Sequence, residues 1–250
     1  MGWWEEWRGR LGLGGTGQGG GRRRGALRED LDPALAEAWE RLSAAAPYLP
    51  ETPLDDVELL ALDLETTGLQ PSKHELLSFG LVPVRGGEVR LAGARHLPVR
   101  PRGDVGDSAT VHGLTDDRLA TEPTVAEVLP AVLRALVTVD GRRRVLLAHF
   151  AQVETSFLED AGVEVLGTWL DLQVVDTLEV ERRLLGAQHS EMRPGAVRLH
   201  TCRTRHHLPR YQAHSAVVDA VACAELFLAQ SATLAGRRRR PLLLADMLAP

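Results

Sequence analysis

Cysteine is scarce in this chain of 250 residues, which contains only Cys202 and Cys223. Two cysteines without a CxxC pair cannot build a disulfide framework, which fits a reducing compartment. The N-terminus also lacks the apolar core of a secretory signal, so we expect an unsecreted, cytoplasmic protein. No stretch approaches the ~18 uninterrupted apolar residues that a membrane-spanning helix needs, and we predict no membrane span.

Positive charge is not in excess either. Lysine and arginine together number 29 against 34 acidic residues, which gives a formal net charge of −5. This balance excludes a protein that binds polyanions through its overall charge, so any binding of nucleic acid must come from a local site. Lys73 is the only lysine, a bias that we attribute to a GC-rich genome. With 44% hydrophobic residues, the chain can bury a sizeable core.

Composition divides the chain into four segments. Residues 1–26 are rich in glycine and arginine, and we predict that they are flexible. For residues 27–52 we predict a helix and a linker, with Asp32 as the cap and Pro33 at the first helical position. The main domain spans residues 53–232. Residues 233–250 predict a solvated or weakly docked tail.

The hydrophobic pattern of the main domain predicts an α/β fold, a five-stranded mixed sheet flanked by helices. The expected strands cover residues 57–65, 77–84, 88–98, 145–148 and 174–176. The expected helices cover residues 124–137, a stretch through 154–158, 177–185 and 215–229.

Acidic side chains interrupt two of these apolar patterns. Asp63 and Glu65 lie two residues apart in the first strand, so they point to the same face. Asp219 lies on an apolar stripe of the last helix, and His214 precedes that helix by one residue. Two ionised carboxylates on one face repel each other and are costly to desolvate, which a raised pKa or a bound cation resolves. We therefore predict a site for a hard divalent metal.

These residues form motifs that resemble the DEDD superfamily of 3′–5′ exonucleases. The stretches Asp63 to Gly68 and His214 to Asp219 match its first and third motifs. The histidine identifies the subclass that includes the proofreading ε subunit of bacterial DNA polymerase III and oligoribonuclease. The tyrosine subclass would place Tyr four residues before Asp219, where this chain has Ser215. The resemblance covers roughly residues 55–230 and makes residues 53–232 the exonuclease domain. One departure is Glu154, which stands where the family usually has Asp.

The resemblance implies a ribonuclease-H-like fold and two divalent metal ions, Mg²⁺ or Mn²⁺. Its metal ligands would be Asp63 as the bridging residue, Glu65 and Asp219 on the first ion, and Glu154 on the second. His214 would be the general base, and the product a nucleoside 5′-monophosphate from the 3′ end of DNA.

The resemblance also implies residues that contact the substrate. Thr66 and His112 would lie near the terminal nucleotide. Leu69 and Phe157 would stack on its base or wedge it, and His149 would contact phosphate. The expected partner is a single-stranded DNA 3′ end.

Other functions stay open at the sequence level. Nothing in the motifs reads a 2′-hydroxyl, so an exoribonuclease that acts on short RNA is an alternative. Another is a non-catalytic module for binding nucleic acid or a partner, in which Glu154 has spoiled the second metal position. A polymerase or replication protein is a further possible partner, for which no surface can be identified.

Several other patterns have simpler interpretations. Asp176 is typical of a helix cap. The literal GxGxxG at residues 15–20 has no strand before it and does not indicate a dinucleotide site. The stretch from His200 to His207 fits no standard zinc spacing and is interpreted as an ordinary polar segment. The arginine clusters at 22–24 and 237–240 either contact DNA or are solvated.

Overall fold

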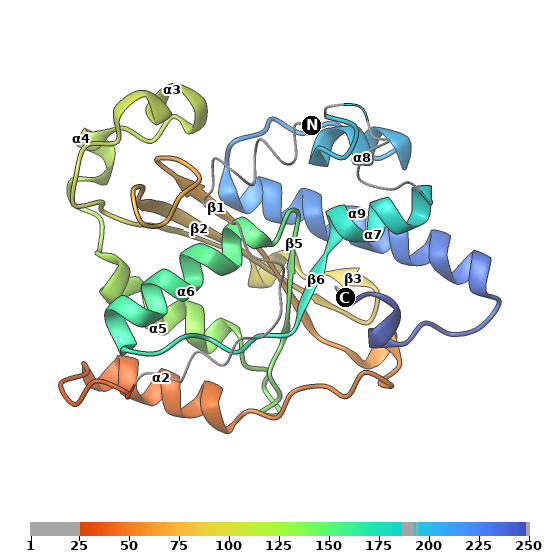
Figure 1. Cartoon of the computed structure of the whole chain (residues 1–250), viewed down its shortest axis with the longest axis horizontal. Coiled ribbons are helices and arrows are strands. Elements are labelled where there is room, and N and C mark those ends of the chain that lie inside the picture. Colours follow the sequence, from red (N-terminus) through yellow and green to blue (C-terminus); the bar gives the residue numbers. More distant parts are fainter. Residues whose placement is uncertain (1–25, 187–192, 194, 249–250) are drawn as a thin grey trace.

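A computed structural model describes residues 26–186, 193 and 195–248 of this chain (Figure 1). Several sequence patterns lie outside the described residues: residues 1–25 of the segment predicted to be flexible, with the GxGxxG stretch and the arginines at 22–24.

A six-stranded mixed sheet forms the centre of the described fold, with strand order β3-β2-β1-β5-β6 and β4 also paired with β2. The strands are β1 (Leu59–Thr66), β2 (Leu76–Arg85), β3 (Glu88–Val89), β4 (Arg95–Pro98), β5 (Val145–Ala148) and β6 (Val174–Asp176). Strand β1 runs antiparallel to β2 and parallel to β5, and β5 runs parallel to β6. The fold is thus the α/β, ribonuclease-H-like arrangement expected.

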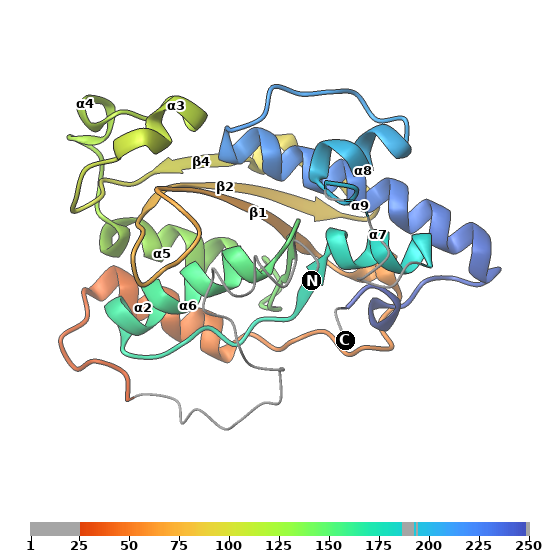
Figure 2. The ribbon, with the colours of Figure 1, turned by 45° about the horizontal axis from the view of Figure 1, so that its top comes forward.

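The α-helices lie on the two faces of this sheet. They are α2 (Pro33–Ala44), α3 (Ala109–His112), α4 (Asp116–Leu119), α5 (Val125–Ala135), α6 (Gln152–Leu166), α7 (Thr177–Leu185), α8 (Leu199–Arg205) and α9 (Ala216–Arg238). Short 3-10 turns cover Leu54–Asp56, Leu91–Gly93, Gly106–Ser108 and Leu244–Asp246. Figure 2 shows α2, α5 and α6 on one side of the strands and α8 and α9 on the other.

Each face of the sheet has its own hydrophobic core. Because side chains alternate along a strand, β1 sends Leu60 and Leu62 to the core under α2, α5 and α6. It sends Leu59 and Ala61 to the core under α9. Since β1 is buried on both faces, its acidic residues stand out from an otherwise apolar strand.

The expected strand at 88–98 is wrong, because it is two strands separated by the turn Leu91–Gly93. The reason lies in the neighbouring strand. Pro83 accepts a hydrogen bond from the Arg90 amide at 2.8 Å, but a proline has no N–H to return the second bond of the pair. The pairing with β2 therefore stops after β3 and resumes at β4, which gives six strands instead of five.

The last helix and the C-terminal segment also differ from expectation. Helix α9 runs nine residues past the expected end at 229, to Arg238. The segment after it, which the sequence predicts to be solvated or weakly docked, places Leu244 and Met247 fully buried in the core under α9. Backbone hydrogen bonds hold it: Leu54 donates to Leu242 and Leu244 donates to Thr52, both at 2.9 Å. A packed and hydrogen-bonded segment of this kind is part of the fold.

Helix α9 is long and apolar enough to cross a membrane, judged by length and composition alone. In the structure it lies against the sheet, with Ala220, Ala224 and Phe227 buried in the core. A buried core helix passes the same test, so its hydropathy is weak evidence for a membrane span.

Candidate metal centre and active site

The two acids of β1 lie on the face that α9 covers. Asp63 and Glu65 alternate with Leu62 and Leu64, whose side chains pack in the opposite core. A shift in the pairing with β2 follows between Glu65 and Thr66, at the point where the strand ends. The strand thus delivers both carboxylates to one side at its open end.

A glycine lets the third acid approach them. Gly80 of β2 pairs with Asp63 across the sheet. A Cβ atom at Gly80 would lie 2.1 Å from the backbone carbonyl of Ala216, the first residue of α9. The missing side chain therefore lets the start of α9 rest directly on the sheet, which brings in Asp219. Carboxylate oxygens of Asp63, Glu65 and Asp219 all lie within 4.8 Å of one another.

The electrostatics of this group are unfavourable without a cation. Burial, and then the charges of Glu154, Asp219 and Glu65, raise the pKa of Asp63 well above its ordinary value. Burial and the charge of Asp219 raise the pKa of Glu65 to about 7. Burial also raises the pKa of Asp219, opposed by the backbone hydrogen bond from His214. A divalent cation bound among these carboxylates would offset their mutual repulsion and the cost of burying their charges.

Glu154 lies in the first turn of α6, next to this group but outside the set of three. Its side chain is buried, and its Oε2 atom has no hydrogen-bond partner among the described residues. Burial and the charge of Asp176 raise its pKa well above the ordinary value. An unpartnered buried carboxylate oxygen beside three other acids fits a role as an additional metal ligand.

Asp176 caps α7, which confirms the prediction of a helix cap, and it also positions the start of α6. Its side chain accepts a hydrogen bond from the Leu178 amide at 2.9 Å and so caps α7. It also accepts from the amides of Phe150 and Ala151, at 2.9 and 3.0 Å, just before α6 begins. One carboxylate thereby fixes two helix ends, one of which carries Glu154.

His214 precedes α9 at the mouth of the site. Its side chain is exposed, and its backbone amide donates to Asp219 Oδ2 at 2.8 Å. The backbone of His214 is left-handed, with φ of 72°. The carboxylate therefore holds the loop in the conformation that presents the imidazole beside the acids.

His112 is the last residue of α3. Burial, and then the charge of His214, lower the pKa of His112. The Nδ1 atom of His112 accepts from the Leu114 amide at 3.1 Å, which leaves the proton of the neutral ring on Nε2. That atom is buried and has no hydrogen-bond partner among the described residues.

The other expected substrate contacts divide into two kinds. Thr66 ends β1 and donates to the Gly68 carbonyl at 2.6 Å, and Leu69 is 40% exposed on the following loop. Both lie on the loop that leaves the site. Phe157, by contrast, is 2% exposed and belongs to the core under α6, so the expectation that it stacks on a base is wrong. It follows from the apolar stripe of α6 that Phe157 faces the sheet.

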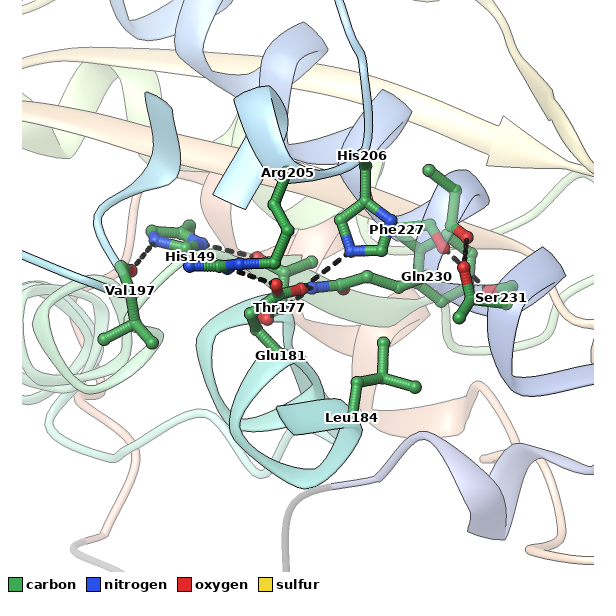
Figure 3. Close-up of polar contacts among 12 residues, drawn as sticks. His149, Thr177, Glu181, Leu184, Val197, Arg205, His206, Phe227, Gln230 and Ser231 are labelled. Carbon is green, nitrogen blue, oxygen red and sulfur yellow. Dashed lines mark hydrogen bonds and ion pairs between the residues drawn. The ribbon is translucent and has the colours of Figure 1, made fainter. Parts of the chain in front are cut away.

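The structure also corrects the prediction that His149 contacts phosphate. Its Nε2 atom donates to the Val197 carbonyl at 2.9 Å and its Nδ1 atom contacts the Thr177 hydroxyl at 2.8 Å (Figure 3). Burial lowers its pKa to about 4, so the ring is neutral near pH 7. A neutral imidazole with both nitrogens occupied is not a cation for phosphate.

Two further patterns have structural roles. In the stretch from His200 to His207, Cys202 is buried and His206 bonds Glu181 at 2.9 Å, as expected of an ordinary polar segment. In the cluster at 237–240, Arg238 and Arg240 pair with Asp246, which docks the C-terminal segment. These arginines lie at the end of α9 opposite Asp219, about 28 Å away at the rise of a helix.

Sequence reasoning missed two residues that shape the site, Gly80 and Arg203. A glycine inside the apolar run of β2 was a usable signal, because such a glycine often marks a close approach of backbone. Arg203 gave no signal, since its partners Glu225 and Pro209 come from separate segments.

The residues present fit divalent metal ions. Three carboxylates lie within common reach, a fourth has an unpartnered buried oxygen, and every donor is an oxygen atom, as Mg²⁺ and Mn²⁺ prefer. Together with the imidazole of His214, this fold and site have the acids and the histidine that the resemblance to the DEDD superfamily implies.

Comparison with known families narrows this class. The RNase T family, described as Exonuclease, matches residues 60–227, and the chain belongs to this family. A DNA polymerase III subunit epsilon-like protein of Rhodobacter capsulatus is 32% identical over 190 residues, which are 72% of this chain and 24% of that protein. A PolC-type DNA polymerase III of Thermotoga maritima is 28% identical over 174 residues, 69% of this chain and 12% of that protein. The chain therefore spans a quarter or less of these relatives.

Solved structures share the fold. The nuclease domain of 3′hExo, a DEDDh family member bound to rAMP, superposes with a TM-score of 0.60 at 15% identity, covering 80% of this chain and 98% of that one. Exonuclease X in complex with 5′ overhanging duplex DNA gives a TM-score of 0.52 at 21% identity, covering 70% and 92%.

Proposed function

We propose that this protein is a metal-dependent 3′–5′ exonuclease that hydrolyses phosphodiester bonds at the 3′ end of single-stranded DNA and releases nucleoside 5′-monophosphates. The observation that carries the proposal is the group of three carboxylates within 4.8 Å, with His214 at its mouth. Asp63, Glu65, Asp219 and Glu154 would hold the ions. Two bound Mg²⁺ or Mn²⁺ ions would supply stabilisation of the negative charge on the attacking and leaving oxygens of an in-line displacement.

The residues of the chain supply the rest of the chemistry. His214, exposed beside the acids, accepts a proton from the attacking water near neutral pH. Thr66 and Leu69 on the loop after β1 and the Nε2–H of His112 contact the terminal nucleotide. Together they would orient the last phosphodiester of a strand.

DNA is the proposed substrate because the relatives matched by sequence are DNA polymerase III proteins. RNA is the second candidate, since one solved neighbour holds rAMP. Parallel digestion of a DNA and an RNA oligonucleotide of the same sequence distinguishes the two. The polymerase names of the relatives also support a replication partner, and the two free thiols support a cytoplasmic location.

The direct test is release of mononucleotides from 3′-labelled single-stranded DNA in the presence of Mn²⁺. We expect wild-type protein to release them and D63A to lose at least ~10³-fold in rate. No release by wild type, or equal release by D63A, rejects the proposal.

Glu154 decides between an enzyme and a binding module. We expect E154Q to lose activity, because the amide cannot replace the charge of the carboxylate, whereas E154D keeps the charge and retains part of the rate. Titration calorimetry with Mn²⁺ then counts the ions. One ion bound without turnover in wild type indicates the non-catalytic module.

A further inference from the structure

A surface formed by α8 and the loop that follows it, here called the wall, adjoins the metal site. One cavity of about 240 Å³ is lined by Asp63, Asp219 and His214 of the metal site, and also by a second group that includes His200, Arg210 and Tyr211. The second group belongs to α8 and to the loop that connects α8 to α9. A ligand at the carboxylates therefore has direct access to this wall.

The sequence of this wall is opposite in charge to the site. Residues 192–218 contain no Asp or Glu, but five arginines and four histidines. The chain as a whole has a formal net charge of −5, so the basic stretch is a local feature. A basic surface beside a metal centre suits a ligand that carries negative charges in succession.

The inward basic side chains of this segment already have an acidic partner. Arg205 and His206 both bond Glu181 of α7, and Gln230 of α9 donates to the same carboxylate at 2.8 Å (Figure 3). These contacts tie α8 to its two neighbouring helices.

Arg203 holds the loop in the same way. It pairs with Glu225 at 2.8 Å, donates to the Pro209 carbonyl at 2.8 Å and lies 4.6 Å from the centre of the Tyr211 ring. Tyr211 itself donates to Glu225 at 2.8 Å. The wall is therefore built in advance of any ligand, and Pro209 and Tyr211 fix Arg210 between them.

Three exposed arginines in the described part of this stretch have no acidic partner: Arg193 and the two that flank α8. Arg198, just before α8, and Arg210, in the cavity wall, are exposed. Neither forms an ion pair or a side-chain hydrogen bond with any described residue, whereas Arg203 and Arg205 do. Free guanidinium groups on a fixed wall are suited to bind phosphate oxygens.

We infer that the wall from Arg198 to Arg210 binds the backbone of a single nucleic-acid strand upstream of the scissile phosphate, with Arg210 on the phosphate next to it. This inference rests on the proposed function and adds a substrate of at least two nucleotides. A mononucleotide ester reaches the carboxylates without touching this wall, but a longer strand contacts both.

The test compares two substrates and three variants in the presence of Mn²⁺. The substrates are the p-nitrophenyl ester of thymidine 5′-monophosphate and a single-stranded DNA oligonucleotide. The variants are R210A, R198A and the control R41A, an exposed arginine of α2 on the other side of the sheet. Circular dichroism checks that each variant is folded.

We expect R210A to raise the KM for the oligonucleotide about tenfold more than the KM for the ester, as loss of one charged hydrogen bond implies. The slope of log K against log salt should fall by about 0.7, the value for one phosphate contact on a single strand. R210K should restore most of that slope, R198A should act in the same direction as R210A, and R41A should match wild type.

The outcomes separate the two claims. If wild type hydrolyses neither substrate, the proposed function fails and this inference fails with it. If wild type hydrolyses both, but R210A and R198A match R41A in oligonucleotide KM and salt slope, the exonuclease proposal stands and the strand-binding wall is wrong.

Discussion

Asp63 occupies a position that its own charge makes unfavourable. Its burial and the charges of three neighbouring carboxylates all raise its pKa. No cation of the described chain pairs with it. At the scale of the residue, this site is stable in its ionised form only when another charge enters from solution.

The charge of Asp63 should therefore lower the stability of the protein without metal and raise it when metal is bound. Without metal at pH 8, D63N should melt at a higher temperature than wild type, by at least about 2 °C, because the variant removes one of the repelling charges. With Mn²⁺, wild type should gain stability and D63N should gain little. Thermal melts with EDTA and with Mn²⁺ measure both, and D55N, an exposed acid, serves as the control. A D63N protein that gains as much from Mn²⁺ as wild type contradicts the assignment.

His149 makes stability depend on pH. Its pKa in the folded protein is about 4, against ~6.5 unfolded, so unfolding takes up a proton between those values. The free energy of unfolding should therefore fall as the pH is lowered from about 6.5 to 4. The loss is at most a few kcal/mol, since each pKa unit corresponds to ~1.4 kcal/mol.

Urea unfolding at several pH values measures this dependence. H149Q, which cannot titrate, should flatten the slope in that window even if it lowers stability at pH 7.5. H207N changes an exposed histidine and should keep the wild-type slope. An unchanged slope in H149Q would show that other groups dominate.

At the scale of the elements, the site depends on how closely α9 approaches β2. Gly80 is the contact point, because a side chain there would overlap the backbone of Ala216 and Val217. Asp219 follows only three residues after Ala216 in the same helix. A small displacement of the helix start therefore moves a metal ligand.

We predict that G80A lowers the free energy of unfolding by about 3 kcal/mol or more, since the added methyl meets backbone that cannot rotate away. It should also weaken Mn²⁺ binding, measured by titration calorimetry on the folded fraction. The control is G236A in α9, where an added Cβ atom meets nothing within 4 Å. That variant should be neutral or stabilised by up to about 1 kcal/mol.

The elements predicted from sequence are those set by local pattern. Helix α7 spans residues 177–185 as expected, and β5 and β6 match, because apolar periodicity and the Asp176 cap lie within each segment. The break between β3 and β4 was not predictable from their own residues, since Pro83 on the neighbouring strand causes it. The carboxylates of the site followed from spacing, but the neutral state of His149 depends on its burial in the folded chain, beneath segments that are remote in sequence.

At the scale of the molecule, the C-terminal segment closes the core under α9. Leu244 and Met247 fill this core, and Asp246 binds Arg238 and Arg240. The segment also joins the chain just before β1 through the Leu54 and Leu244 amides. It therefore fastens the strand that carries Asp63 to the helix that carries Asp219.

We predict that L244A lowers the free energy of unfolding by about 2–5 kcal/mol, the cost of a cavity in a packed core. Chemical denaturation measures this cost. The control is L91A, at a leucine that is 62% exposed, which should stay within about 0.5 kcal/mol of wild type. Equal stability of L244A and L91A would mean that the segment is not packed in solution.

The left-handed backbone of His214 has a practical consequence. Asparagine adopts this conformation more readily than most residues, so H214N should fold with its loop in place while lacking the imidazole. Such a variant should retain strands without cutting them. Immobilised on beads and mixed with total cellular nucleic acid, it would act as a trap, and sequencing the captured strands would reveal which ends the protein selects.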